Sequence, residues 1–385
     1  MHNILTLNNI AKVGLDKFNS DYHVSDDLKN PEAILLRSHN LHDYDIPASV
    51  QVIARAGAGT NNIPIEKMTA LGIPVLNTPG ANANAVKELV ITGMLLACRN
   101  ICPAWEYACN VQGSNEEITK QVEKNKKNFS GFELPGRTLG IIGLGNIGVK
   151  VANAARYLDM NVIGFDPAIT VESAWQLRSS VQQATNIDEV IANSDFISIH
   201  VPLNQHTKNL IDSKQFAAMK QGVTLLNFAR SGIINDHALL QALQINKVHR
   251  YVCDFPSNEF KANPKVISLP HLGASTVEAE ENCAVMAANQ IKLFLETGEI
   301  KNSVNFPNVK LSKSTGTRIG IVNKNVPNMV AQITGKLSHE GINIVDMINK
   351  SRNDIAYTLI DTESIDDKVL HMIEEIDGVI HARLI

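Results

Sequence analysis

The feature that most constrains this 385-residue chain is one continuous stretch, residues 138–166. An apolar run that predicts a buried strand is followed at once by glycines spaced G-x-G-x-x-G, a stretch of helical periodicity, a second apolar strand and Asp166. This is the element order of a βαβ unit that binds a dinucleotide. The glycine spacing alone is weak evidence, because an ordinary βα turn can carry it, but here all five elements occur in register.

Each glycine of the motif has a separate physical role. We expect Gly143 to allow the tight turn, Gly145 to let a pyrophosphate approach the backbone, and Gly148 to let the helix pack on the strand. The free N–H groups at the start of the helix then attract phosphate. Asp166 follows the second strand, where a carboxylate accepts hydrogen bonds from a ribose 2′-OH and repels a 2′-phosphate. The sequence therefore predicts NAD rather than NADP.

Length and composition set broader limits. A chain of 385 residues can form two or three domains, and shares of 44% hydrophobic and 19% charged residues are typical of globular proteins. The formal charge of −4 gives no general attraction to nucleic acid or membranes, and we expect no secretory signal and no membrane span. The five cysteines are odd in number and form no C-x-x-C pair, so we expect free thiols in a cytoplasmic protein and no metal site.

The first hundred residues alternate short apolar strands with helical stretches, which predicts a separate parallel α/β sheet. Strands are expected at 4–7, 33–36, 50–54 and 73–76, and helices at 60–71 and 84–99. Arg37 and Arg55 each follow a strand, at the sheet edge where ligands collect. Arginine binds phosphate or carboxylate through paired hydrogen bonds, so the two residues favour a doubly anionic substrate. A solvated arginine at a strand end is the alternative for each.

The central segment continues with strands whose ends carry residues suited to hydride chemistry. These strands are expected at 196–200, 223–228, 251–254 and 266–269. Arg230, Glu259 and His271 follow the last three. A histidine can take a hydroxyl proton as hydride leaves the carbon, a carboxylate on its other ring nitrogen fixes the tautomer, and an arginine can bind a substrate carboxylate. Alone, His271 could cap a helix and Glu259 could be solvated, but after a dinucleotide-binding unit the set indicates catalysis.

The run 113–133 is polar and carries a cluster of lysines, at positions 120, 124, 126 and 127. Most runs of this kind are solvated faces. The alternative is that one lysine reaches an anionic substrate, in the same chain or in a partner subunit.

The chain resembles the D-isomer-specific 2-hydroxyacid dehydrogenases, and within them the branch that oxidises D-3-phosphoglycerate. The matching stretches begin at Arg55, Leu139, His200, Asn227 and Pro270, and the resemblance extends over essentially the whole length. It implies that Arg230 orients the substrate, that Glu259 is the partner of the histidine, and that His271 is the acid/base. Glu259 is followed here by Phe260, where the family usually has proline.

The resemblance also implies two sets of ligand contacts and a domain division. The cofactor contacts are Thr78, Gly143, Gly145, Asn146, Ile147, Gly148, Asp166, His200, Val201, Pro202, Thr207, Phe228, Ala229, Asp254 and Gly273. The substrate contacts are Arg37, Ser38, Arg55, Ala56 and Gly57. Residues 1–98 with 285–302 are expected to form a discontinuous, flavodoxin-like substrate-binding domain, and residues 99–284 a Rossmann-type NAD-binding domain.

Residues 303–317 are polar and turn-rich, which predicts a linker. Residues 318–385 then read strand, helix, strand, strand, helix, strand, an order that gives a four-stranded antiparallel sheet with both helices on one face. The strands are expected at 318–323, 342–349, 355–361 and 379–384, and the helices at 327–340 and 364–376.

This last segment resembles an ACT domain, a ferredoxin-like regulatory unit that binds amino acids at paired domain edges. A module that serves only dimerisation is the alternative. The resemblance implies L-serine as effector, with contacts from Asn323, Asn325 and Asn343, and a homo-oligomer that is a dimer or a tetramer.

Two other functions are open at this point. One is a dehydrogenase for another 2-hydroxy or 2-oxo acid, such as 2-oxoglutarate or glyoxylate. The other is a non-enzymatic NAD sensor, because some proteins of this fold act as transcriptional co-repressors. The presence of Arg230, Glu259 and His271 argues against the sensor, as does the lack of a DNA-binding motif.

Overall fold

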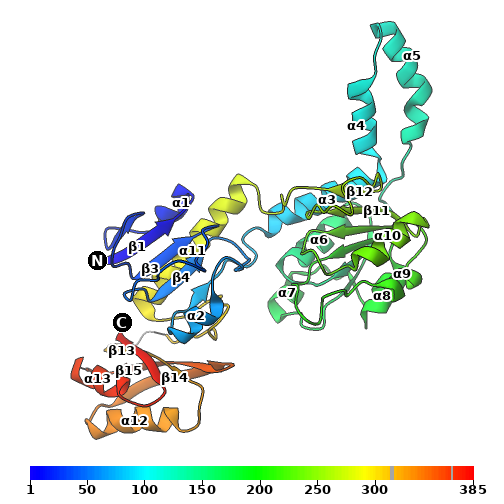
Figure 1. The fold of residues 1–385 in the computed structure, drawn as a ribbon. Helices are drawn as coiled ribbons and strands as arrows, with labels where there is room; N and C mark the ends of the chain where they lie inside the picture. The colour runs from blue at the N-terminus through cyan, green and yellow to red at the C-terminus, as the bar shows by residue number, and fades with distance from the viewer. Residues whose placement is uncertain (313–315, 366) are drawn as a thin grey trace. The chain divides into compact units, whose positions relative to one another are not determined.

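The computed structural model describes residues 1–312, 316–365 and 367–385. Contacts divide the chain into two compact units: unit 1 comprises Met1–Asn82 and Val277–Ile385, and unit 2 comprises Ala83–Thr276. The expected fold class, parallel α/β sheets followed by a small antiparallel sheet, is confirmed (Figure 1). Among the described residues, we find no helix with the length and apolar character needed to cross a membrane.

Unit 2 is built around a seven-stranded sheet in the order β12-β11-β10-β9-β6-β7-β8, with every pairing parallel. Its strands are β6 (Thr138–Ile142), β7 (Asn161–Phe165), β8 (Gln182–Gln183), β9 (Phe196–Ile199), β10 (Val223–Asn227), β11 (Val248–Cys253) and β12 (Val266–Ser268). The chain order reverses between the neighbours β6 and β9. Ligands of such sheets bind at the carboxyl ends of the strands beside this switch point.

Helices cover both faces of this sheet, because its strands are apolar on both sides. They are α3 (Ala83–Cys98), α6 (Asn146–Tyr157), α7 (Val171–Gln176), α8 (Ile187–Asn193), α9 (Ser213–Ala218) and α10 (Asp236–Gln244). Residues of α3 and α6 share one core with Ile141 and Leu226, whereas residues of α8, α9 and α10 share the other with Ile142 and Leu225. Adjacent residues of one strand thus enter opposite cores, as the pleat requires.

A helical arm projects from unit 2 (Figure 1). It consists of α4 (Ile101–Asn110), α5 (Asn115–Asn125) and a single 3-10 turn (Lys126–Phe129), and neither α4 nor α5 has a buried residue. Ser114 caps α5 in a capping box with Glu117. The lysine-rich run was expected as a solvated face, or as the source of a lysine for an anionic substrate, so the helical arm was missed. Neither helix buries a residue, and α5 has a side-chain cap whereas α4 does not.

Unit 1 contains a five-stranded parallel sheet in the order β2-β1-β3-β4-β5. The strands are β1 (His2–Leu7), β2 (Tyr22–Ser25), β3 (Ala33–Leu36), β4 (Val52–Arg55) and β5 (Val75–Leu76), and the helices are α1 (Lys12–Leu15), α2 (Ile65–Ala70) and α11 (Val277–Thr297). Residues of α11 share a core with Val52 and Ala54, while Ile53 joins a second core with Met68 of α2. The edge strand β2 was not predicted, because it is short and only Tyr22 in it is buried.

The C-terminal part of unit 1 is a four-stranded antiparallel sheet, as predicted, and the structure gives its strand order as β14-β15-β13-β16. Its strands are β13 (Thr317–Lys324), β14 (Ile344–Arg352), β15 (Ile355–Thr362) and β16 (Val379–Leu384), and its helices are α12 (Met329–His339) and α13 (Asp367–Glu374). Both helices pack on the face that carries Ile321 and Ile360. The opposite face, with Tyr357 and Leu359, joins the core of the N-terminal sheet.

The two units divide the chain at positions other than the expected domain limits. Helix α3, expected in the N-terminal domain, packs against α6, β10 and β11 and belongs to unit 2. Within the expected linker 303–317, Ser303 and Asn305 are buried and hydrogen-bonded to Val75 of β5, so this part is packed against the N-terminal sheet. Residues 313–315 of that linker, and residue 366 of the expected last helix, lie outside the described residues.

Candidate functional site

The glycine motif forms the turn between β6 and α6. Gly143 has a φ of +95°, and a β-carbon there would lie 2.7 Å from the carbonyl oxygen of His200. A β-carbon on Gly148 would overlap the carbonyl oxygen of Gly143, well inside the 3.0 Å that real β-carbons keep. Gly145, by contrast, has no heavy atom within 4 Å of its β-carbon position. Packing within the protein therefore explains why positions 143 and 148 are glycine. The β-carbon position of Gly145 faces open space.

Gly145 is also the N-cap of α6, and no side chain caps this helix. The first N–H groups of α6 are therefore available for an anion beside an open backbone surface. Asp166 follows β7 and faces this turn: one carboxylate oxygen accepts from the N–H of Leu144 at 2.8 Å and the other from the N–H of Ala168 at 2.9 Å. Its position is thus fixed by backbone, which fits a ribose-binding carboxylate.

The loop after β9 lies on the other side of the switch point. His200 is linked to Ser198 (Nε2 to Oγ, 2.9 Å), and burial lowers the pKa of His200 to about 4, so its ring is neutral at ordinary pH. The expected contacts Val201, Pro202 and Thr207 follow, and the Thr207 hydroxyl closes the loop by donating to the carbonyl of Pro202 at 2.5 Å. The structure therefore brings the expected phosphate, ribose and loop residues to one edge of the sheet.

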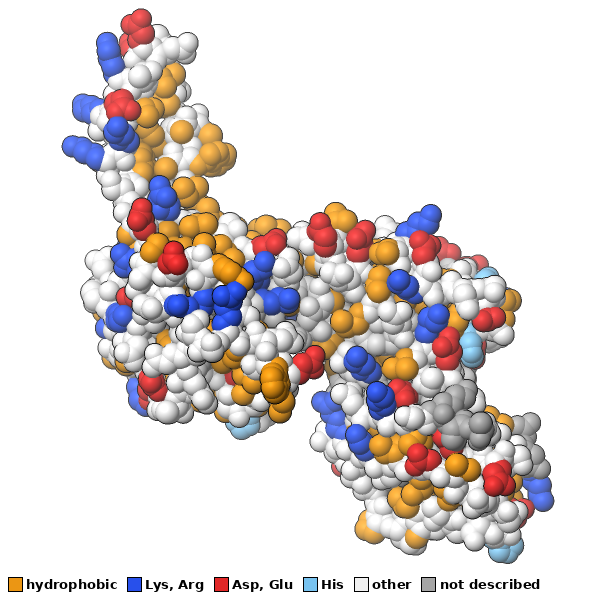
Figure 2. Space-filling model, turned by 180° about the vertical axis from the view of Figure 1, so that it is seen from behind, with side chains coloured by type: hydrophobic (Ala, Val, Ile, Leu, Met, Phe, Trp, Pro, Cys, Tyr) orange, Lys and Arg blue, Asp and Glu red, His pale blue; other side chains and the backbone are white. Residues whose placement is uncertain are grey.

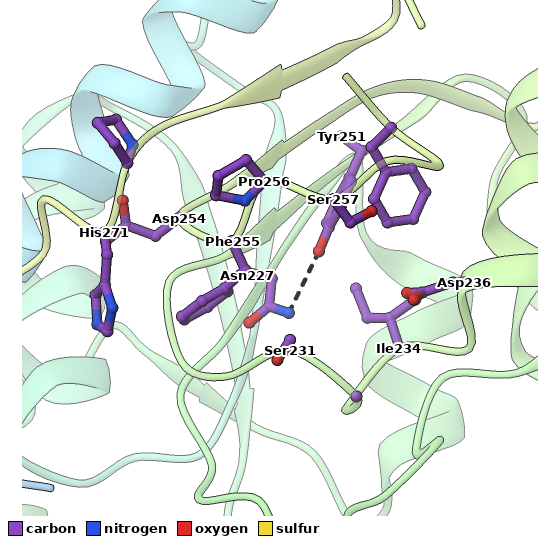
Figure 3. A pocket seen from close by; sticks show the side chains of 13 residues that line it. Asn227, Ser231, Ile234, Asp236, Tyr251, Asp254, Phe255, Pro256, Ser257 and His271 are labelled. Atoms are coloured by element: carbon purple, nitrogen blue, oxygen red, sulfur yellow. Dashed lines mark hydrogen bonds between the residues drawn. The ribbon is translucent and has the colours of Figure 1, made fainter. Parts of the chain in front are cut away.

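A cavity of about 460 Å³ lies at the ends of β10, β11 and β12 (Figure 3). The loops after these strands line it, with His271 at one end and Asp236 at the other. His271 has a φ of +56°, and its ring meets the ring of Phe255 edge-on, with centroids 5.3 Å apart. A histidine with positive φ is uncommon, and such residues cluster at functional sites.

The three predicted catalytic side chains are not all inside this cavity. All three side chains are exposed, but only His271 lines the cavity; Arg230 and Glu259 directly precede the lining residues Ser231 and Phe260. Within the described ranges, no hydrogen bond joins Glu259 to His271. Backbone hydrogen bonding lowers the pKa of the Glu259 carboxyl, and one Arg230 nitrogen donates to the carbonyl of Ala229 at 2.6 Å.

Several lining residues were not predicted from the sequence. Asn227 ends β10 and donates to the hydroxyl of Tyr251 at 3.4 Å, and burial raises the pKa of that hydroxyl well above its usual value. Burial also raises the pKa of the Asp236 carboxyl, helped by the charge of Glu259. A polar residue that ends an apolar strand was the available signal for Asn227. Asp236 resembles any acidic residue in a first helical turn.

The predicted substrate residues lie at one edge of the sheet in unit 1, but the two arginine side chains among them already have partners. Arg37 forms an ion pair with Glu280, its Nη2 lying 2.7 Å from Oε1. Arg55 donates from Nε to the carbonyl of Arg37 at 2.8 Å and from Nη1 to the carbonyl of Gly59. Arg55 therefore also organises the loop of Ala56 and Gly57. The backbone N–H of the remaining residue, Ser38, donates to the side chain of Asn8.

Thr78, predicted to contact the cofactor, is buried in unit 1, where its backbone N–H donates to the carbonyl of Gly57 at 3.1 Å. The expected effector residues lie in the C-terminal sheet. Asn323 is buried in β13, and Asn325 donates to the carbonyl of Asn353 at 2.9 Å. The strand register places Asn325 and Asn343 at opposite ends of the sheet, so one copy of the chain does not bring them together.

Comparison with known proteins identifies relatives of this arrangement. Residues 91–273 match a family model described as the NAD binding domain of D-isomer specific 2-hydroxyacid dehydrogenase. The chain is 37% identical over 295 residues to D-3-phosphoglycerate dehydrogenase of Methanocaldococcus jannaschii, covering 74% of this chain and 54% of that one. It is 33% identical over 340 residues to D-3-phosphoglycerate dehydrogenase of Haemophilus influenzae, covering 85% and 79%.

A solved structure of a related enzyme also matches the fold of this chain. The NAD+-bound 3-phosphoglycerate dehydrogenase of Entamoeba histolytica matches with a TM-score of 0.60 and 26% identity, covering 79% of this chain and 98% of that chain. The chain spans about half the length of the archaeal relative and most of the bacterial one. The matched family model contains the glycine turn and Asp166, so the prediction of NAD as cofactor is confirmed.

Proposed function

Because the chain belongs to the D-isomer specific 2-hydroxyacid dehydrogenases, we propose that it oxidises D-3-phosphoglycerate to 3-phosphohydroxypyruvate, the first step of L-serine biosynthesis. The observation that carries the proposal is His271, which lines a cavity at the sheet edge that also holds the glycine turn and Asp166. An acid/base group is then available at the edge where a dinucleotide binds.

The proposed roles follow from the chemistry of each side chain. NAD, when bound, accepts the hydride from C2 of the substrate. His271 takes the proton of the C2 hydroxyl, since an imidazole has a pKa near operating pH. Arg230 binds the substrate carboxylate, and Glu259 holds the other ring nitrogen of His271. Glu259 must then move toward His271 when substrate binds, because in this structure it is exposed and not bonded to the ring.

The cofactor is held by residues whose backbone the fold already fixes. The N–H groups of Asn146, Ile147 and Gly148 bind the pyrophosphate above the open surface of Gly145. Asp166 accepts hydrogen bonds from the ribose. Arg37 and Arg55 are the proposed partners of the substrate phosphate, and Glu280 neutralises part of the charge of Arg37 until phosphate replaces it.

The direct test is NAD-dependent oxidation of D-3-phosphoglycerate, followed by NADH formation with the product trapped as a hydrazone. We expect activity in the native protein and its loss in His271→Ala, with NAD affinity unchanged. Arg55→Ala should mainly raise KM. Activity only on 2-oxoglutarate or glyoxylate, tested in the reductive direction, would identify a related dehydrogenase. A folded protein that binds NAD and reduces none of these acids would be a sensor.

We also propose that the chain is a cytoplasmic homo-oligomer with a regulatory C-terminal sheet. The five cysteines are all free thiols, which suits a reducing compartment. Hydrophobic side chains run along the arm (Figure 2), where Trp105 is 69% exposed, and a second copy would cover them. A second copy would also supply Asn343 to Asn325 of the first. Serine titration with and without Asn325→Ala tests this arrangement: equal binding by both proteins would refute it.

A further inference from the structure

Two buried polar side chains lie at the ends of the neighbouring strands β10 and β11. Asn227 is the last residue of β10, Asp254 directly follows β11, and each is 1% exposed. The N–H of Asp254 donates to the carbonyl of Asn227 at 3.3 Å, so the two strand ends are linked. Buried amides and carboxylates are tolerated when their polar atoms are bonded, and the partners of these two side chains indicate what they do.

The side chain of Asn227 holds the turn that carries Arg230 through hydrogen bonds to its backbone. Its Oδ1 accepts from the N–H of Ala229 at 3.1 Å, and its Nδ2 donates to the carbonyl of Arg230 at 2.9 Å. A second, longer bond from Nδ2 reaches the hydroxyl of Tyr251. One amide thus bonds the backbone of the turn as acceptor and as donor. An amide carries its acceptor and its donor on two separate atoms, which an ionised carboxylate or an aliphatic side chain of similar size does not.

The carboxylate of Asp254 holds the loop that carries His271. One oxygen accepts from the N–H of Leu272 and the other from the N–H of Gly273, both at 2.7 Å. Two consecutive N–H groups that converge on an anion form a backbone nest, and here the anion is a side chain of the protein itself. The nest begins directly after the positive φ of His271, a conformation that is unfavourable for residues other than glycine.

We propose that Asn227 and Asp254 are positioning residues, Asn227 for Arg230 and Asp254 for His271. Figure 3 shows Asn227 and Asp254 beside the cavity that His271 lines. Each oxygen of Asp254 accepts one N–H from the loop and keeps acceptor capacity, so holding the loop is compatible with the cofactor contact that the family resemblance implies. The inference rests on the proposed dehydrogenase function, which it deepens by naming what holds each reacting side chain in place.

The test uses two substitutions that preserve shape. Asn227→Asp keeps the acceptor for Ala229 and loses the donor to Arg230. Asp254→Asn replaces one acceptor by a donor that faces a backbone N–H. A displacement of about 1 Å can cost about 10²-fold in rate. We therefore expect Asp254→Asn to lower kcat by about that factor with KM nearly unchanged. Asn227→Asp should raise KM, because a displaced Arg230 no longer binds the substrate carboxylate.

Each substitution is then repeated in His271→Ala and in Arg230→Ala. If Asp254 acts through His271, Asp254→Asn has less than about a twofold further effect in the His271→Ala protein, but its full effect in Arg230→Ala. Asn227→Asp must show the reverse pattern. General damage to the fold would lower the activity of all four double variants by the same factor. The proposal would be overturned if the activity losses of Asp254→Asn and His271→Ala multiplied, or those of Asn227→Asp and Arg230→Ala. It would also be overturned if Asp254→Asn lowered NAD affinity in the His271→Ala protein.

Hydrogen exchange supplies a readout that does not depend on activity. Exchange of the amides in segment 270–276 should be faster in Asp254→Asn than in Asn227→Asp, which serves as its matched control. If Asp254→Asn does not fold, Asp254→Ser removes the carboxylate with a smaller group. Equal exchange rates in both variants would refute the role of Asp254 in holding the loop that carries His271. A native protein without dehydrogenase activity would instead refute the proposed function, and the exchange comparison would still decide the role of Asp254.

Discussion

Substitution of the motif glycines by alanine should separate cofactor binding from stability. Gly145 has φ −76° and ψ −164°, which alanine adopts without strain, and its β-carbon would meet no heavy atom within 4 Å. The lost freedom of the unfolded chain favours alanine by about 0.4–1 kcal/mol, and the poor N-cap preference of alanine offsets a similar amount, so Gly145→Ala should leave the stability of unit 2 nearly unchanged. The new methyl group, however, fills the surface that the pyrophosphate must approach.

The expected loss of affinity can be sized from the hydrogen bonds that a displaced pyrophosphate forfeits. A hydrogen bond to a charged group contributes about 1.5–3 kcal/mol. Loss of one such bond in Gly145→Ala raises the Kd for NAD by a factor of about 10 to 150. Isothermal titration calorimetry measures this change directly.

Gly148→Ala should behave in the opposite way. Its β-carbon would overlap the carbonyl oxygen of Gly143, a backbone atom that cannot move without opening the turn. Overpacking costs about 1–3 kcal/mol or more, against a gain of about 1 kcal/mol for alanine over glycine within a helix. Because a backbone atom is the one overlapped, we expect the upper end of this range, a net loss of up to about 2 kcal/mol, which lowers the melting temperature of a unit of this size by up to about 4–8 °C.

Gly335 of α12 is the matched control, because a β-carbon there also meets nothing within 4 Å and the helix lies in unit 1. Gly335→Ala should gain stability and bind NAD as the native protein does. The reasoning would be refuted if Gly145→Ala bound NAD with native affinity, or if Gly148→Ala melted at or above the native temperature.

Three further substitutions test other parts of the structure. Arg318→Met should destabilise unit 1 by about 3–5 kcal/mol, measured by urea unfolding. The reason is that the carboxylate of Asp361 stays buried without the guanidinium that binds it at 2.6 and 2.8 Å. A smaller loss of stability would show that water reaches Asp361. Asp166→Ala should narrow the preference for NAD over NADP, measured as the ratio of kcat/KM, and an unchanged ratio would exclude Asp166 from the ribose site. His200 has a folded pKa of about 4 against an unfolded value near 6.5, so the unfolded state binds the proton first. Stability should be complete above pH 6.5 and fall by roughly 3 kcal/mol toward pH 4, and His200→Gln should flatten this part of the profile.

The parts of the fold that the sequence predicts well are those in which local pattern and burial agree. Strand β3 is apolar throughout, β10 is mainly apolar, and every residue of both is buried, so the residues alone locate them. The glycine motif was predictable in the same way, because two of its glycines are required by contacts within the motif or with the adjacent strand end.

The site was harder to predict where a residue acts through distant partners. Nothing next to Arg55 in the sequence indicates that its guanidinium bonds the carbonyls of Arg37 and Gly59. The backbone nest around Asp254 joins residues 18 and 19 positions apart. Glu259 is exposed, and neither its burial nor its sequence neighbours indicate a partnership with His271.

The buried face of the C-terminal sheet has a consequence for how unit 1 unfolds. Tyr357 donates from its hydroxyl to the carbonyl of Gly298, and Arg383 reaches both Gln51 and the carbonyl of Phe294, so the two sheets share one hydrophobic core. They should therefore melt in a single cooperative transition. A ligand that binds only the C-terminal sheet then lowers the population of open forms throughout the N-terminal sheet, by mass action and without any change of shape.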